Sequence, residues 1–250
     1  MSHIVTIASG KGGVGKTWLA ASLAQAAAEQ GQRVLLVDAD WGLANADVQL
    51  GVTGAPCLPV HGRAEDLLAA VHPVAGFHLL AGASGSGRLA DLAPATLERL
   101  AAELQRAARR YDVVLVDLAS GADRSIRRWW QLGAERFLVM TPDPTSLTDA
   151  YAFLKLCCRD GDAAGARLIV NRAPSRPIGE ATAERLARAA AGFLHLAVET
   201  AAILLEDPRV PSAIRAQQPF MQHYPTSPMA ANLRALSTPR GSPRSDDARA

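Results

Sequence analysis

The chain has 250 residues, of which 49% are hydrophobic and 20% are charged, and its formal net charge is +2. This balance is ordinary for a soluble globular protein, and the charge is too close to neutral to indicate bulk binding of nucleic acid. Its three cysteines give neither a disulfide framework nor a C-x-x-C metal spacing, and no apolar run approaches the roughly 20 residues of a membrane-spanning helix. We therefore expect a cytoplasmic protein.

Short apolar runs alternate along the chain with longer segments rich in alanine and leucine. The expected strands are residues 3–9, 33–40, 77–82, 112–117, 136–142, 167–172 and 193–199. Most of them are continuous apolar runs, which is typical of parallel strands covered on both faces. A helix is expected over residues 16–30, ending at Gly31. A second helix is expected over residues 97–110, with an apolar face formed by Leu97, Leu100, Leu104 and Ala108.

This alternation indicates an α/β fold with a doubly wound, mostly parallel sheet of about seven or eight strands. We expect one domain over residues 1–237. Residues 238–250 are rich in Pro, Ser, Arg and Asp, and they are expected to form a disordered tail.

The stretch GKGGVGKT, residues 10–17, follows the first expected strand and fits the P-loop pattern G-x-x-x-x-G-K-[ST]. Glycines let such a loop turn its backbone N–H groups toward phosphate oxygens, and the following helix adds its positive end. Lys16 is expected to reach the β- and γ-phosphates of a nucleotide, and Thr17 to ligate Mg²⁺. A glycine-rich turn with incidental lysines is the competing interpretation. The expected nucleotide-binding residues of this segment are Gly10, Gly12, Gly13, Val14, Gly15, Lys16, Thr17 and Trp18.

Lysine is rare in this chain, which otherwise uses arginine for its permanent positive charges. Lys11 and Lys16 are two of only three lysines among 26 basic residues. A compact ammonium group can enter a nest of phosphate-binding amides, whereas the planar arginine fork is too broad. The choice of lysine therefore supports a phosphate site.

Acidic residues follow two of the expected strands. Asp38 and Asp40 end the strand at 33–40, and their spacing of two puts both side chains on one face. Asp117 ends the strand at 112–117 in the same way. Ligands bind at the carboxyl ends of parallel strands, so Asp38 and Asp117 are predicted at the Mg²⁺ site and Asp40 beside the attacking water. Polar strand ends without a catalytic role are the alternative.

The form KGGVGKT resembles the deviant P-loop of the MinD/ParA class of P-loop ATPases. Further segments resemble the FlhG group within that class, also called FleN or YlxH, whose members set flagellar number and placement. These segments are GLANADVQLG (42–51), TPDPTSLTDAYAFLK (141–155), IVNR (169–172) and EDPRVPSAIRAQQPF (206–220). The resemblance extends over roughly residues 3–236 and implies a MinD-like fold.

The resemblance also implies roles for residues outside the phosphate-binding pattern. Lys11 would reach across an ATP-bound homodimer to the partner's nucleotide, and an exposed surface lysine is the alternative. The amide of Asn171 would read adenine, unless it caps a turn instead. Asp207 and Pro208 would flank the base. The expected catalytic residues are Lys11, Lys16 and Asp40.

The resemblance implies an ATP- and Mg²⁺-dependent dimerising switch with slow hydrolysis. Its expected partner is a flagellar transcription regulator or a basal-body component, with recruitment to a cell pole. Two alternatives remain open. One is a ParA-like or cellulose-synthesis-associated positioning ATPase, and the other is a nucleotide-gated scaffold with negligible hydrolysis.

Several positions depart from the family pattern. Trp18 and Ser22 replace more polar or amide residues of the P-loop helix, and DLASGA (117–122) lacks the usual Pro-Ala-Gly or Gly-Ala-Gly order. We therefore predict intact nucleotide binding and slow turnover. The sequence shows neither a glutamine-rich motif that activates the GTPase FlhF nor a C-terminal amphipathic helix. Membrane attachment by that usual helix is not expected, and neither is nucleic-acid binding.

The stretch DRSIRRWWQL, residues 123–132, combines three arginines with Trp129 and Trp130. Adjacent residues of a helix face different directions, so one tryptophan is expected in the core and the other at the surface or in an interface. The exposed tryptophan and the arginines could then form a partner-binding patch. In the alternative interpretation, one tryptophan lies in the core and the arginines are solvated on a helix face.

Overall fold

The computed structural model of the chain describes residues 3–40, 44–82, 92–161 and 163–237. The tail expected over residues 238–250 lies outside the described residues. The strands are β1 (His3–Ser9), β2 (Val34–Ala39), β3 (His72–Val74), β4 (Phe77–Leu80), β5 (Val113–Ser120), β6 (Glu135–Met140), β7 (Ala166–Ala173) and β8 (Glu199–Leu205). The helices are α1 (Lys16–Glu29), α2 (Ala46–Gln49), α3 (Ala64–Ala69), α4 (Pro94–Ala108), α5 (Arg124–Trp130), α6 (Pro144–Arg159), α7 (Arg176–Leu194), α8 (Arg209–Arg215), α9 (Phe220–His223) and α10 (Pro228–Ser237).

One eight-stranded sheet runs through the molecule in the order β3-β4-β2-β5-β1-β6-β7-β8. Every neighbouring pair is parallel except β3 and β4, which form an antiparallel edge hairpin. The chain starts in the middle of the sheet at β1 and builds outward to both sides, so the predicted doubly wound α/β fold is confirmed. All the parallel strands end at one edge, where ligands bind in such folds.

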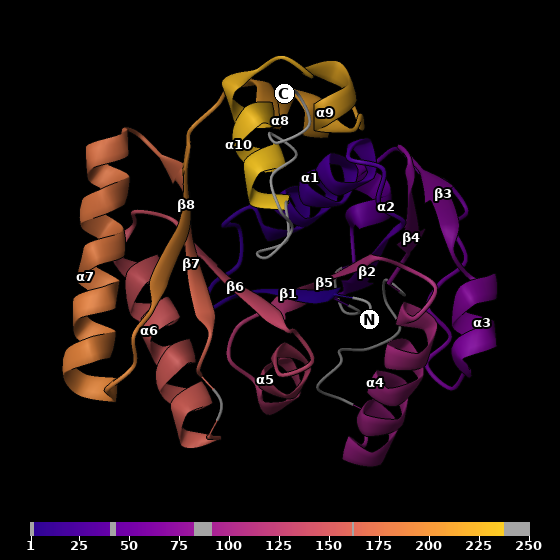
Figure 1. Cartoon of the computed structure of the whole chain (residues 1–250), viewed down its shortest axis with the longest axis horizontal. Coiled ribbons are helices and arrows are strands. Elements are labelled where there is room, and N and C mark those ends of the chain that lie inside the picture. The colour runs from indigo at the N-terminus through magenta and orange to yellow at the C-terminus, as the bar shows by residue number, and fades with distance from the viewer. Residues whose placement is uncertain (1–2, 41–43, 83–91, 162, 238–250) are drawn as a thin grey trace, which may run out of the picture.

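Helices cover both faces of this sheet (Figure 1). One face carries α1 and α2 with the C-terminal helices α8 to α10, and the other carries α3 to α7. Alternate residues of β1 supply the two cores, since Val5 and Ile7 pack toward α1 whereas Ile4 and Ala8 face the opposite layer. Leu97, Leu100, Leu104 and Ala108 of α4 are all buried, as their spacing predicts. No helix in the described part of the chain is long and apolar enough to cross a membrane.

The last expected strand, residues 193–199, is wrong. Helix α7 continues through Leu194 and ends where His195 takes a left-handed conformation, with φ 52°. The strand follows as β8, whose alanine-rich sequence gives a weak β-strand signal. The short strand β3 was also missed, because it contains Pro73 and pairs with β4 through a two-residue turn, Ala75–Gly76.

The expectation of one exposed tryptophan in residues 123–132 is wrong. Trp129 and Trp130 are both fully buried. The seven-residue helix α5 lies beneath the sheet between α4 and α6, so it is covered on more than one side (Figure 1). Trp130 packs edge-to-face on Phe153 of α6, with ring centroids 5.3 Å apart, and Arg127 pairs with Asp160 at 2.6 Å. The tryptophans are therefore part of the core and do not form a partner-binding patch.

Candidate functional site

The glycine-rich loop connects β1 to α1 at the carboxyl edge of the sheet. Its backbone takes left-handed conformations at Gly13 and Gly15, with φ of 76° and 88°, which a residue with a side chain adopts only under strain. The Ser9 hydroxyl donates a 2.7 Å hydrogen bond to the Lys11 carbonyl, and the Gly121 N–H donates to the Ser9 carbonyl at 2.9 Å. The loop is thus fastened to the end of β5.

Gly10 allows the loop to approach the backbone of α6. A Cβ atom at this position would lie 2.3 Å from the Asp149 carbonyl oxygen, a distance that requires helix α6 to move. We expect Gly10→Ala to lower the free energy of unfolding by about 1–3 kcal/mol, as overpacking does, when it is measured by urea titration. Gly192→Ala is the control, because a Cβ there meets nothing within 4 Å. It should stabilise helix α7 by about 0.5–1 kcal/mol. Equal effects of the two substitutions would contradict the close approach.

Asp38 and Asp117 occupy paired positions on the neighbouring strands β2 and β5. Only 1% of each residue is exposed, and Lys16 at the start of α1 is itself 7% exposed. Burial raises the pKa of Asp117, while the Lys16 charge and the Thr17 hydroxyl act in the opposite direction. The structure therefore brings together the four residues that the sequence predicts around the phosphates and Mg²⁺.

The two carboxylates differ in how they are satisfied. Asp38 accepts hydrogen bonds from the backbone N–H groups of Asp40, Asn45 and Ala46 at 3.0–3.1 Å. Burial and then the charge of Asp117 nevertheless raise the pKa of Asp38 to about 7. Both carboxylate oxygens of Asp117 are buried, and the Thr17 hydroxyl is the donor that acts on them, although it forms no full hydrogen bond in the described part of the chain.

This arrangement fits a magnesium ion bound together with a nucleotide. Buried acceptor oxygens without donors are costly unless a cation or a proton satisfies them. Mg²⁺ takes oxygen ligands and is usually held by one or two carboxylates together with substrate phosphates. The described residues contain no group of three or more His, Cys, Asp or Glu side chains that could hold a metal alone. Asp38, Asp117 and the Thr17 hydroxyl could hold Mg²⁺ together with phosphate and water.

Asp40 and Lys11 lie at the outer margin of the site. Asp40 follows β2 directly and is partly buried. Its negative charge raises the pKa of Asp117, but less strongly than burial does. Lys11 is exposed at the loop's crest, where its ammonium group donates a 2.7 Å hydrogen bond to the Thr145 hydroxyl at the start of α6. Sequence analysis missed this partner, although Thr145 lies within one of the segments that carry the family resemblance.

Asn171, Asp207 and Pro208 lie at the ends of β7 and β8. Asn171 is 3% exposed, and its side-chain N–H₂ group donates to the Val14 carbonyl at 2.8 Å. A Cβ atom on Gly15 would lie 2.5 Å from the same nitrogen, so the amide rests against the loop. Asp207 forms a 2.7 Å ion pair with Arg209, which lowers the pKa of Asp207. The sequence did not indicate Arg209 as the partner of Asp207.

Known proteins resemble this chain in both sequence and structure. The family model described as the CobQ/CobB/MinD/ParA nucleotide binding domain matches residues 5–220. The chain belongs to the MinD/ParA family.

Among relatives of this MinD/ParA-family chain is the "Antiactivator FleN" of Pseudomonas aeruginosa, 33% identical over 94% of this chain and 85% of FleN. The "Flagellum site-determining protein YlxH" of Helicobacter pylori is 32% identical, and the match covers 76% of this chain and 64% of YlxH. The septum site-determining protein MinD of Pyrococcus horikoshii, complexed with Mg-ADP, is 27% identical with a TM-score of 0.76, and the match covers 95% of each chain. The resemblance stated from sequence is confirmed.

Proposed function

We propose that this MinD/ParA-family chain is an ATP-dependent dimerising switch with slow ATPase activity. The observation that carries the proposal is the set of buried charged residues Lys16, Asp38 and Asp117, in which neither Asp117 oxygen accepts a full hydrogen bond within the described part of the chain. Such a group is costly in an empty protein and becomes satisfied when a triphosphate and a divalent cation occupy the loop.

Each residue has a distinct part in this proposal. The loop N–H groups and Lys16 bind the β- and γ-phosphates, and Thr17, Asp38 and Asp117 hold Mg²⁺. When bound, Mg²⁺ neutralises charge that develops on the phosphates. Asp40 orients the attacking water. Asn171 keeps its side-chain carbonyl oxygen for the adenine amino group, because its N–H₂ is already bonded to Val14.

Dimerisation supplies the switch. In a single subunit Lys11 is bonded to Thr145 of its own chain. We propose that in the ATP state Lys11 leaves Thr145 and reaches the nucleotide of a second subunit. Hydrolysis removes the γ-phosphate, and the dimer dissociates.

The relatives support a role in flagellar assembly. FleN is named an antiactivator and YlxH a flagellum site-determining protein. We propose that this chain regulates flagellar number or placement in the cytoplasm, with recruitment to a cell pole, through a transcription regulator or a basal-body component.

The switch is tested by measuring molar mass in solution with ADP and with an unhydrolysable ATP analogue. We expect a monomer with ADP and a dimer with the analogue. Lys11→Ala should bind the analogue but remain a monomer, because the contact across the dimer is lost. Lys155→Ala, which removes an exposed lysine from the middle of α6, is the matched control and should dimerise normally. A wild-type monomer under both conditions would refute the switch.

A scaffold that works by nucleotide occupancy alone is the second candidate. It is favoured by the end of β5, where DLASGA (117–122) lacks the Pro-Ala-Gly or Gly-Ala-Gly order expected for the family, and where Ser120 lies beside Gly12. Single-turnover hydrolysis separates the candidates, since the scaffold would retain ATP unhydrolysed in its dimer.

A further inference from the structure

Trp18 lies two residues after Lys16, and its side chain packs on the C-terminal segment of the chain. The residue is 5% exposed, and its indole meets Phe220 edge-to-face with ring centroids 5.4 Å apart. It lines a small cavity with Leu50, Ile214 and Pro219. Trp18 therefore joins the first turn of α1 to the C-terminal part of the chain.

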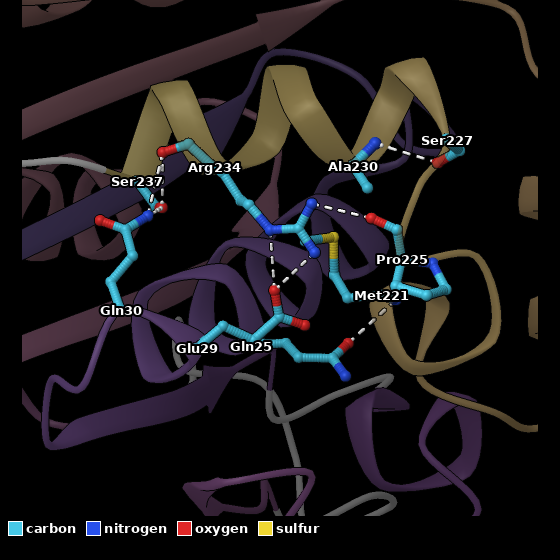
Figure 2. Close-up of polar contacts among 9 residues, drawn as sticks. All are labelled: Gln25, Glu29, Gln30, Met221, Pro225, Ser227, Ala230, Arg234 and Ser237. Atoms are coloured by element: carbon cyan, nitrogen blue, oxygen red, sulfur yellow. Dashed lines mark hydrogen bonds and ion pairs between the residues drawn. The ribbon is translucent and has the colours of Figure 1, made fainter.

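The same side of α1 holds the C-terminal segment at further points. The Gln25 side-chain oxygen accepts a 3.0 Å hydrogen bond from the buried Met221 N–H, one residue after Phe220. One turn further along, Glu29 pairs with Arg234 of α10 at 2.8 Å (Figure 2). Trp18, Gln25 and Glu29 are spaced as residues on one helix face, so they form a single docking stripe for residues 209–237.

A short series of contacts leads from Phe220 to the end of β8. Phe220 packs on Tyr224 with centroids 5.4 Å apart, and the Arg209 guanidinium lies 5.9 Å from the Tyr224 ring centroid. Arg209 in turn holds both carboxylate oxygens of Asp207. Asp207 and Pro208 are the residues expected beside the base.

We propose that Trp18 is a positioning residue for the base end of the nucleotide site. By packing on Phe220 it fixes the segment that starts at Asp207–Pro208, and so it strengthens binding of the adenosine part of ATP but not of the phosphates. This inference rests on the proposed ATP-binding function.

The two ends of the proposed ligand would meet different parts of the chain. The loop backbone and Lys16 would form the phosphate cradle, whereas the Trp18 indole packs on Phe220 of the C-terminal segment. The indole N–H is buried without a hydrogen bond in the described part of the chain, so the side chain acts by packing. Truncating it would loosen residues 207–224 and leave the loop N–H groups in place.

The test compares two ligands that share the phosphates and differ in the nucleoside, Mg-ATP and magnesium tripolyphosphate, by titration calorimetry. Trp18→Ala should lower the affinity for Mg-ATP by about tenfold and change the affinity for tripolyphosphate by less than about twofold. Trp18→Phe should restore most of the ATP affinity, because a phenyl ring can still meet Phe220. Phe220→Leu should reproduce the selective loss from the other side of the contact.

Leu100→Ala is the control for a general loss of core packing, because it empties a fully buried position in α4 on the opposite face of the sheet. Leu100→Ala should not lower the affinity for one of the two ligands more than for the other. A parallel loss of ATP and tripolyphosphate in the folded Trp18→Ala and Phe220→Leu proteins would overturn the inference, and so would no loss of either. Failure of the wild type to bind Mg-ATP would instead refute the proposed function.

Discussion

Replacing Lys16 with glutamine is expected to raise the dissociation constant for Mg-ATP by about a hundredfold or more. The Lys16 side chain is buried and its charge acts on the Asp117 carboxylate, and in the proposed complex it also faces the β- and γ-phosphates. Truncating one partner of a buried charge pair at a binding site costs about 2–5 kcal/mol of binding free energy, much of it because the other charge stays buried and unpaired. Titration calorimetry with Mg-ATP measures the loss directly.

The matched control for this change is Lys155→Gln, which alters the exposed lysine of α6. Its ATP affinity should equal that of the wild type. Circular dichroism checks that the Lys16→Gln protein is folded. If its dissociation constant for Mg-ATP is within about threefold of the wild-type value, this loop is not the phosphate site.

Asp40→Asn should separate ATP binding from ATP hydrolysis. Asp40 is at the margin of the buried group, and we expect Mg-ATP affinity to change little. A positioned side chain that orients or deprotonates the nucleophile contributes about 10²–10⁴-fold, so phosphate release should fall by about a hundredfold or more. Because hydrolysis would end the dimer in the proposed switch, the variant should also accumulate as an ATP-bound dimer.

Asp47→Asn is the control for this prediction, since Asp47 is a nearby carboxylate on α2 that bonds only to the Val48 N–H among the described residues. Its turnover should match that of the wild type. Equal turnover of Asp40→Asn and wild type would show that Asp40 has no part in hydrolysis.

The fold could be predicted from sequence wherever the local pattern matched the packing. Continuous apolar runs such as residues 113–116 are buried on both sides, because helices cover both faces of the sheet. The pattern failed at residues 193–199, where the apolar residues Leu194, Leu196 and Val198 pack partly buried against the core outside any strand. Alternating hydrophobicity does not distinguish a loop covering a core from a strand within it.

The prediction that one of Trp129 and Trp130 is exposed was wrong for a different reason. The prediction assumed a helix with one buried face, but α5 is short and has neighbours on more than one side. Such surroundings arise from contacts with α4 and α6 that are distant in sequence, so the local spacing carries no information about them.

The candidate site was predictable to the extent that strand ends determine it. Asp38 and Asp117 follow apolar runs, and the parallel register then places them side by side. Contacts between distant segments were not predictable. Thr145 beside Lys11, Val14 beside Asn171 and Phe220 beside Trp18 are separated in the chain by 134, 157 and about 200 positions respectively.

Helix α1, which follows the glycine-rich loop, is enclosed on two sides. Eleven of its 14 residues are buried, with the sheet on one side and the docking stripe for residues 209–237 on the other. A rigid-body shift of this helix would break both contacts at once. In the proposed switch, the part of the site that rearranges with nucleotide occupancy is therefore expected to be residues 119–122 at the end of β5, while α1 and the segment docked on it stay fixed.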